Sequence, residues 1–140
     1  MASYDGPKKI AIIGGGPAGL MAAESACSKG LEVTLYERKA SVGRKFLIAG
    51  RGGLNLTHSE PMPAFVQRYR EQNTAVGKWL KEFDNQDLSA WSHGLGIDTF
   101  TGSSGRIFPK DMKAAPLLRS WLKRLRESGV HFEVNHQALG

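Results

Sequence analysis

The fold is decided by residues 8–37, which read KKIAIIGGGPAGLMAAESACSKGLEVTLYE. The apolar run at residues 10–13 ends at a cluster of glycines, which is typical of a buried parallel strand. Pro17 then opens a helix that we expect over residues 18–29, because proline is tolerated best in the first helical turn. Residues 33–36 read as a second strand. Strand, glycine turn, helix and strand together predict a βαβ unit of an α/β domain.

The glycine cluster fits the pattern G-x-G-x-x-G at positions 14, 16 and 19. Gly14 permits a tight turn, Gly16 leaves room for a pyrophosphate, and Gly19 lets the helix pack closely on the strand. An acidic residue, Glu37, lies 21 residues beyond the second glycine (37 − 16) and can accept hydrogen bonds from ribose hydroxyls. These features predict a dinucleotide site. A carboxylate at this position disfavours the 2′-phosphate of NADP, whereas the choice between FAD and NAD stays open at this point.

The remainder of the chain shows further elements around this unit. Residues 38–58 show no helical or strand period and carry several glycines, which predicts a long functional loop. Apolar positions in residues 61–95 indicate short helices, and residues 97–100 and 106–108 flank a glycine turn that predicts a β-hairpin. Leu117, Leu118, Trp121, Leu122 and Leu125 form a helical stripe, and residues 130–134 read as a third strand.

Composition excludes several classes of protein. One cysteine in 140 residues rules out a disulfide framework within the chain, and the four histidines show no ligand spacing, so we expect no metal site. The sequence has no apolar run of membrane-spanning length and begins with polar residues, so we expect a cytoplasmic protein without a membrane partner. The net charge of +6 suits an anionic cofactor as well as nucleic acid. Because no aromatic residues are interleaved with the cations at base-stacking spacing, we expect no nucleic-acid partner.

Two further motifs carry a resemblance to a known family. Residues 41–60 read SVGRKFLIAGRGGLNLTHSE, and residues 105–109 read GRIFP. Together with GGGPAG, they resemble the conserved-flavoprotein family of NAD(P)/FAD-dependent oxidoreductases, which includes aminoacetone oxidase-like and bile-acid dehydro-reductase-like proteins. Many members carry Arg-Cys-Asn where Gly53-Leu54-Asn55 stands here, and this departure points to a subgroup.

The resemblance implies the N-terminal portion of a discontinuous, glutathione-reductase-like FAD-binding domain of the Rossmann type. Residues 1–58 would form the βαβ unit and flavin loop, residues 59–110 a helical and hairpin insertion, and residues 111–140 a helix and third strand. We expect the rest of the FAD domain and a substrate domain to lie outside this chain, which alone would be incomplete and inactive.

The expected activity is that of an FAD-dependent oxidoreductase, with hydride transfer through flavin N5, a small-molecule substrate and NAD(P)H as a possible electron donor. The catalytic residues are not identifiable from the sequence. The alternatives are a non-catalytic nucleotide-binding fragment, an NAD-binding domain and a basic nucleic-acid-binding module. The expected cofactor-binding residues are Gly14, Gly16, Pro17, Ala18, Gly19, Glu37, Arg38, Arg44, Lys45, Asn55 and Thr57.

Overall fold

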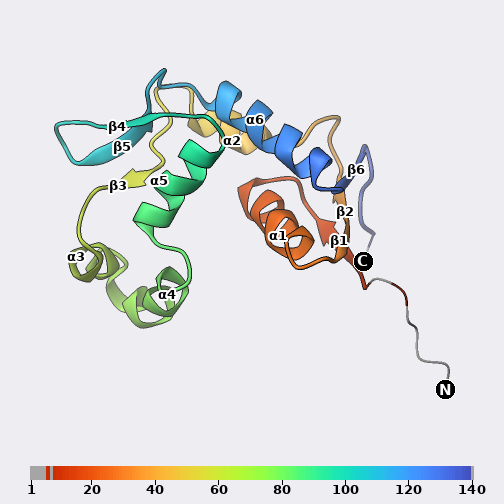
Figure 1. Ribbon diagram of the computed structural model, residues 1–140, viewed down its shortest axis with the longest axis horizontal. Coiled ribbons are helices and arrows are strands. Elements are labelled where there is room, and N and C mark those ends of the chain that lie inside the picture. Colours follow the sequence, from red (N-terminus) through yellow and green to blue (C-terminus); the bar gives the residue numbers. More distant parts are fainter. Residues whose placement is uncertain (1–5, 7, 140) are drawn as a thin grey trace. The chain divides into compact units, whose positions relative to one another are not determined.

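A computed structural model describes residue 6 and residues 8–139 (Figure 1). The chain divides into two compact units. The first comprises Met1–Ile48 with Leu118–Gly140, and the second comprises Ala49–Leu117. Within the described residues, no helix combines the length and the apolar character needed to cross a membrane.

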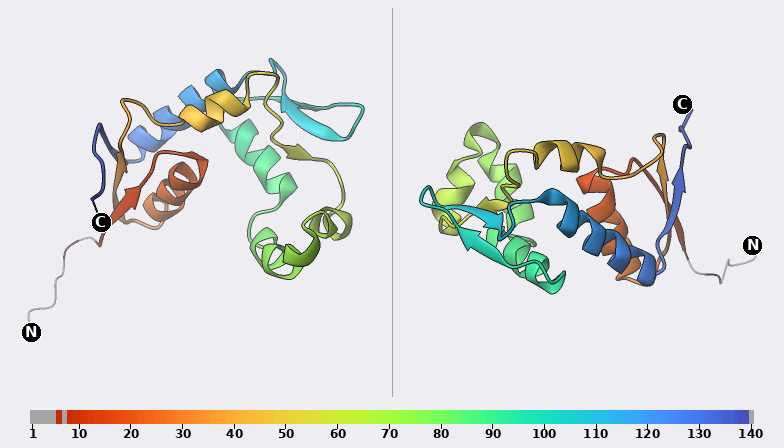
Figure 2. Two further views of the ribbon diagram at one scale, coloured as in Figure 1. Left: turned by 180° about the vertical axis from the view of Figure 1, so that it is seen from behind. Right: turned by 90° about the horizontal axis from the view of Figure 1, so that it is seen from above.

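The first unit is built on a parallel sheet of three strands. These are β1 (Lys9–Ile13), β2 (Glu32–Glu37) and β6 (His131–Val134), in the spatial order β1-β2-β6. In register, Ile10 lies beside Val33, and Leu35 lies beside Phe132. Helix α1 (Pro17–Cys27) connects the first two strands and lies against the sheet in both views (Figures 1 and 2). The expected βαβ unit and third strand are confirmed.

Helix α6 (Ala114–Glu127) supplies the core of the first unit through the expected apolar stripe. Leu118, Trp121 and Leu125 are buried, whereas Arg119 and Lys123 are exposed. The indole nitrogen of Trp121 donates to the Glu24 carboxylate at 2.7 Å, which holds α6 beside α1. Leu20, Ala23, Val33 and Leu35 complete this core.

Strand β1 differs from the buried strand that the sequence suggested. It lies at the edge of the sheet, and its residues alternate between exposed and half-buried positions. Ile12 faces α1, because its Cγ2 would lie 3.5 Å from a Cβ placed on Gly19, whereas Ile13 is 63% exposed. Within the described residues, the apolar run is therefore covered on one face only. Periodicity alone does not distinguish this case from full burial.

The second unit contains a small antiparallel sheet in the order β3-β5-β4, formed by β3 (Thr57–His58), β4 (Thr99–Thr101) and β5 (Arg106–Pro109). The β4–β5 pair confirms the expected hairpin. The expected short helices are α3 (Met62–Gln67), the 3-10 turn η1 (Arg70–Gln72), α4 (Asn73–Leu80) and α5 (Asn85–Gly94).

The prediction of an irregular loop over residues 38–58 is wrong at two places. Helix α2 (Arg44–Ala49) begins after Gly43, whose positive φ of 72° and close contact with Leu118 favour glycine there. Strand β3 exists only because two residues pair with the distant β5. A six-residue helix and a two-residue strand are too short for their periodicity to be visible in the sequence.

Candidate functional site

The glycine turn of the first unit has the geometry that the fingerprint predicts. Gly14 adopts φ = 103°, and its N–H donates to the Tyr36 carbonyl at 2.8 Å. A Cβ on Gly19 would lie 1.9 Å from the Gly14 carbonyl oxygen, so helix and strand can approach this closely only with glycine there. The turn thus brings the N-terminus of α1 to the carboxyl end of β1.

Gly16 lies in open space at this helix N-terminus. A Cβ built on it would meet no described heavy atom within 4 Å, and no side chain caps the helix at Gly16. The first N–H groups of a helix lack partners within the helix, and the positive end of the helix dipole favours an anion beside them. The space that a side chain would fill at Gly16, with these N–H groups beside it, therefore fits the pyrophosphate of a dinucleotide.

Glu37 ends β2 and holds the turn through its carboxylate. One oxygen accepts the Gly15 N–H at 2.9 Å, and the other accepts the Lys39 N–H at 2.8 Å. These two bonds, that from Lys39 foremost, lower the pKa of Glu37, with smaller contributions from the charges of Arg38 and Arg44. The carboxylate is therefore ionised at neutral pH, and each oxygen keeps a lone pair for a ribose hydroxyl.

Sequence reasoning missed the part that Gly15 plays. A Cβ on Gly15 would lie 2.4 Å from Cγ1 of Val42 and 3.2 Å from the Glu37 carboxylate. Its carbonyl also accepts the Gly43 N–H at 2.7 Å, which joins the start of α2 to the glycine turn. The fingerprint pattern leaves this second position free, so the pattern alone carried no signal for it.

The basic residues that were expected to contact the cofactor lie in two segments of the first unit. Arg38 follows β2 and is exposed, and Lys45 is exposed in the first turn of α2. The Arg44 guanidinium donates from Nε to the Ser41 hydroxyl at 3.0 Å. Because Gly43 is bonded to Gly15, Arg44 and Lys45 belong to the segment anchored on the glycine turn.

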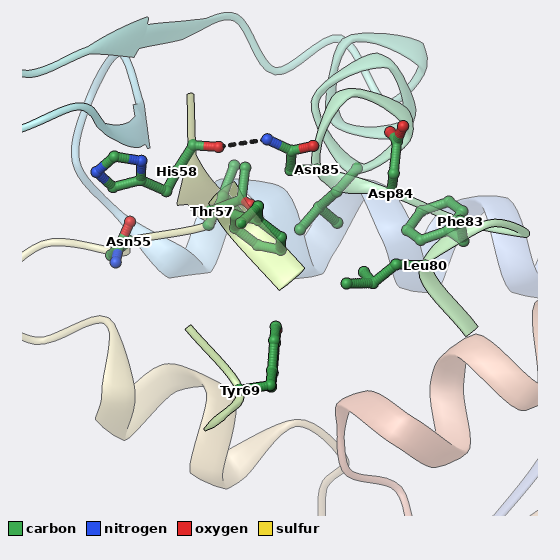
Figure 3. A pocket seen from close by; sticks show the side chains of 11 residues that line it. Asn55, Thr57, His58, Tyr69, Leu80, Phe83, Asp84 and Asn85 are labelled. Carbon is green, nitrogen blue, oxygen red and sulfur yellow. Dashed lines mark hydrogen bonds between the residues drawn. The ribbon is translucent and has the colours of Figure 1, made fainter. Parts of the chain in front are cut away.

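Asn55 and Thr57 belong to the second unit, whereas the other nine expected residues belong to the first. The side-chain amide of Asn55 forms hydrogen bonds when its nitrogen faces the carbonyl oxygens of Thr57 and Ile107, to which it then donates at 2.8 and 3.3 Å. Both residues line a cavity of about 350 Å³ together with His58 and Asn85 (Figure 3). Sequence reasoning missed Asn85 as a lining residue. The only available signal was the Asp-Asn-x-Asp sequence of residues 84–87 at the start of α5, which marks a helix cap and not a site.

This fold and this glycine turn define a dinucleotide-binding domain of the Rossmann type, and the family match that follows places it among the FAD-dependent oxidoreductases. Residues 8–140 match the family described as the HI0933-like protein Rossmann domain. The chain therefore belongs to this family, as the resemblance in its motifs predicted.

Individual relatives match parts of the chain. It is 34% identical over 98 residues to a ribosomal RNA dihydrouridine synthase of Haemophilus influenzae, and the match covers 69% of this chain and 24% of that protein. It is also 36% identical over 64 residues to an NADH oxidase of Thermoanaerobacter brockii, covering 46% of this chain and 9% of that protein. The chain thus spans a quarter or less of the length of these curated relatives.

A solved structure shows the same fold. THI4 of Thermovibrio ammonificans superposes with a TM-score of 0.53 over 91% of this chain and 38% of that chain, at 20% identity. At this identity the similarity concerns the fold alone.

Proposed function

We propose that this chain binds the ADP half of FAD for an oxidoreductase that acts on a small molecule in the cytoplasm. The observation that carries this proposal is the open, uncapped N-terminus of α1 at Gly16, with the ionised Glu37 holding the turn beside it. FAD, when bound, would supply hydride transfer at flavin N5, with NAD(P)H as a candidate electron donor. The chain's own residues would bind and orient the cofactor.

Each expected residue has a specific task in this proposal. The N–H groups of Ala18 and Gly19, at the start of α1, would donate to the pyrophosphate, and Gly16 leaves room for its approach. Pro17 lacks an N–H and fixes the helical start. The second lone pairs of the Glu37 oxygens would accept the ribose hydroxyls.

The charged and polar side chains have a second set of tasks. Arg38, Arg44 and Lys45 would lie along the pyrophosphate and adenosine, where their positive charge complements the phosphates. Asn55 and Thr57 would offer polar contacts toward the flavin. The carboxylate of Glu37 would repel the 2′-phosphate of NADP, which leaves NAD as the competing dinucleotide.

The experiment that tests this proposal compares FAD affinity in two valine variants by titration calorimetry. Gly16→Val places a branched side chain in the pyrophosphate path, so we expect at least a tenfold loss of affinity. Ala22→Val is the matched control, because it adds the same kind of side chain at an exposed position farther along α1. An unchanged dissociation constant for Gly16→Val would overturn the assignment of the turn.

A second candidate function is an action on RNA, as the name of the Haemophilus influenzae relative suggests. Against the expectation of no nucleic-acid partner, the exposed Trp79, with 70% of its surface accessible, stands between Lys78 and Lys81 in the sequence, and the chain carries a net charge of +6. Aromatic and cationic side chains in this arrangement can stack on bases and contact phosphates. Affinity for a single-stranded RNA oligonucleotide that falls steeply with salt and is lost in Trp79→Ala would favour this candidate over the small-molecule substrate.

A further inference from the structure

Another cavity, of about 340 Å³, lies within the second unit beside the β3–β5 pair. The residues that line it are His58, Glu60, Phe65, Arg68, Ser104 and Arg106. We call it the Arg106 cavity. It shares the wall residues His58 and Phe65 with the cavity of Figure 3, but none of the residues assigned to FAD lines it. Its volume lies within the range of small-molecule sites.

The motif GRIFP at residues 105–109 supplies the arginine of this cavity. Gly105 adopts φ = 82°, and a Cβ on it would lie 2.6 Å from the His58 ring, so the fold favours glycine there on both counts. Pro109 is buried at the end of β5. Arg106 is exposed, and its side chain makes no hydrogen bond or ion pair with a described residue. The fold thus accounts for the glycine and the proline of this motif, whereas it leaves the arginine without a partner.

Arg106 carries the one uncompensated charge among the described residues that line this cavity. The Arg68 guanidinium donates from Nε and Nη2 to the two oxygens of Glu60, at 2.9 and 2.8 Å, so these two side chains form a neutral pair. His58 is neutral in this arrangement, because its Nδ1 accepts the Glu60 N–H at 3.1 Å and its Nε2 therefore donates to the Ser104 carbonyl at 2.9 Å. The lining side chains together leave a single positive charge, which a ligand with one negative charge compensates.

The donors of the Arg106 cavity suit a carboxylate. The Arg106 guanidinium offers a planar fork of N–H groups, which matches the two oxygens of a carboxylate. Nη1 of Arg68 takes no part in the pair with Glu60, and the hydroxyl of the exposed Ser104 adds a neutral donor. Phe65 gives the wall an aromatic ring, against which the apolar body of a small acid can pack. A phosphate monoester carries about two negative charges at neutral pH, which is more than this cavity compensates.

We propose that the Arg106 cavity binds a small organic acid through a single carboxylate, with Arg106 as its charge partner. The ring of Phe65 contacts the apolar body of this ligand, and Arg68 and Ser104 donate to its oxygens. This inference goes beyond the proposed function, because the cavity is formed within the second unit and the ADP half of FAD is assigned to the first. The two assignments therefore fail independently.

A matched pair of probes tests the proposal without any substitution. Benzoate and benzamide have the same ring and nearly the same shape, but only benzoate carries a negative charge. In NMR titrations of the chain at constant ionic strength, we expect benzoate to bind at least about tenfold more tightly, because hydrogen bonds between charged groups are stronger than those to a neutral amide. The backbone amide signals of residues 104–106 should shift with benzoate. Equal affinity for both probes, no binding of benzoate or no shift at these residues would overturn the proposal.

Substitutions of two exposed arginines give an independent readout. Arg106→Gln removes the charge but keeps a polar side chain, and it should weaken benzoate binding at least about tenfold. Arg119→Gln is the matched control and should bind benzoate as the wild type does, because Arg119 is exposed on α6 and does not line the Arg106 cavity. Benzoate binding that survives Arg106→Gln, or that falls equally in Arg119→Gln, would show that the cavity does not hold the acid.

Two further titrations separate this proposal from the other assignments. Gly16→Val, which tests the binding of FAD, should leave the affinity for benzoate unchanged, and a loss of that affinity would contradict a separate site. Dimethyl phosphate, a monoanion without an apolar ring, should bind more weakly than benzoate. If it binds more tightly, the cavity takes a phosphodiester such as that of RNA, and the assignment to a small acid is wrong.

Discussion

Gly16 and Gly19 lie three residues apart in one turn but in opposite surroundings. A side chain at position 16 would enter open space, whereas one at position 19 would collide with the Gly14 carbonyl. The fold therefore requires glycine at position 19, whereas the open space at position 16 is what the proposed function assigns to the pyrophosphate. This separation allows binding and stability to be tested with substitutions of the same kind.

We expect Gly19→Ala to lower the free energy of unfolding by about 3 kcal/mol, because its Cβ overlaps a backbone oxygen that cannot move freely. Gly16→Ala keeps an ordinary backbone conformation (φ = −80°) and should change the free energy of unfolding by no more than about 1 kcal/mol while weakening FAD binding. Denaturant unfolding and calorimetry on both variants check this. If Gly16→Ala lowered the free energy of unfolding more than Gly19→Ala did, the assigned roles would be contradicted.

The pKa of Glu37 makes a prediction about pH. Its folded-state pKa lies below the ordinary value of 4.5, so the carboxylate contributes stability above that value and loses it as the pH falls through the folded-state pKa. We expect Glu37→Gln to be about 1 kcal/mol less stable than wild type at pH 7, and the difference to shrink below about pH 4.5.

The control for this prediction is Glu32→Gln, on the same strand. Its partner is the exposed Lys9, at 3.4 Å, and such surface pairs contribute little. A difference between Glu37→Gln and wild type that does not change between pH 7 and pH 3 would contradict the role of the ionised carboxylate in holding the turn.

The sequence predicted the roles of Gly14 and Gly19, because a turn with positive φ and a close helix–strand contact follow from the local pattern. It did not predict that of Gly15, since the constraint comes from Val42 and Glu37, which lie far along the chain. The sequence also could not reveal that Asn85 Oδ1 is buried without a hydrogen-bond partner among the described residues. This follows from the position of the amide, whose nitrogen donates to the carbonyls of His58 and Glu60. Local patterns predict backbone requirements, whereas side-chain environments depend on distant contacts.

At the scale of elements, α5 is fixed at its start by a capping box. The Asp84 side chain accepts the N–H groups of Gln86 and Asp87, and the Asp87 side chain accepts the N–H of Asp84. Asn85 directly follows the cap residue and lines the cavity of about 350 Å³ in the second unit. The sequence predicted a short helix here through its apolar positions.

We expect Asp84→Ala to lower the free energy of unfolding by about 1 kcal/mol, because two N–H groups at the helix start lose their acceptor. Gln86→Ala, an exposed change in the same first turn, should have little effect. Thermal unfolding of both variants, followed by circular dichroism, gives the comparison. Equal midpoints would show that the cap contributes nothing.

Longer elements were predicted better than short ones. The apolar stripe of α6 and the strands of the βαβ unit follow from their own residues. By contrast, α2 and β3 depend on single tertiary features, the Gly43 turn against Leu118 and the pairing with β5. Among the described residues β1 is less buried than predicted, because burial depends on which elements lie on each side of a strand, and one apolar run does not encode that.

At the scale of the whole molecule, the expected cofactor residues divide unevenly between two units. Those assigned to the pyrophosphate, ribose and adenosine belong to the first unit, and Asn55 and Thr57 belong to the second. The ADP half of FAD should therefore account for most of the affinity of this chain. This is the central claim about its function.

Titration calorimetry of the chain with ADP, FAD and riboflavin tests this claim most directly. We predict that ADP and FAD bind with similar affinity and compete with each other, because in the proposed function Gly16, the start of α1 and Glu37 would contact only the part that the two ligands share. Riboflavin, which lacks the pyrophosphate and adenosine, should bind far more weakly. Binding of riboflavin as tight as that of FAD, or no binding of ADP, would contradict the account.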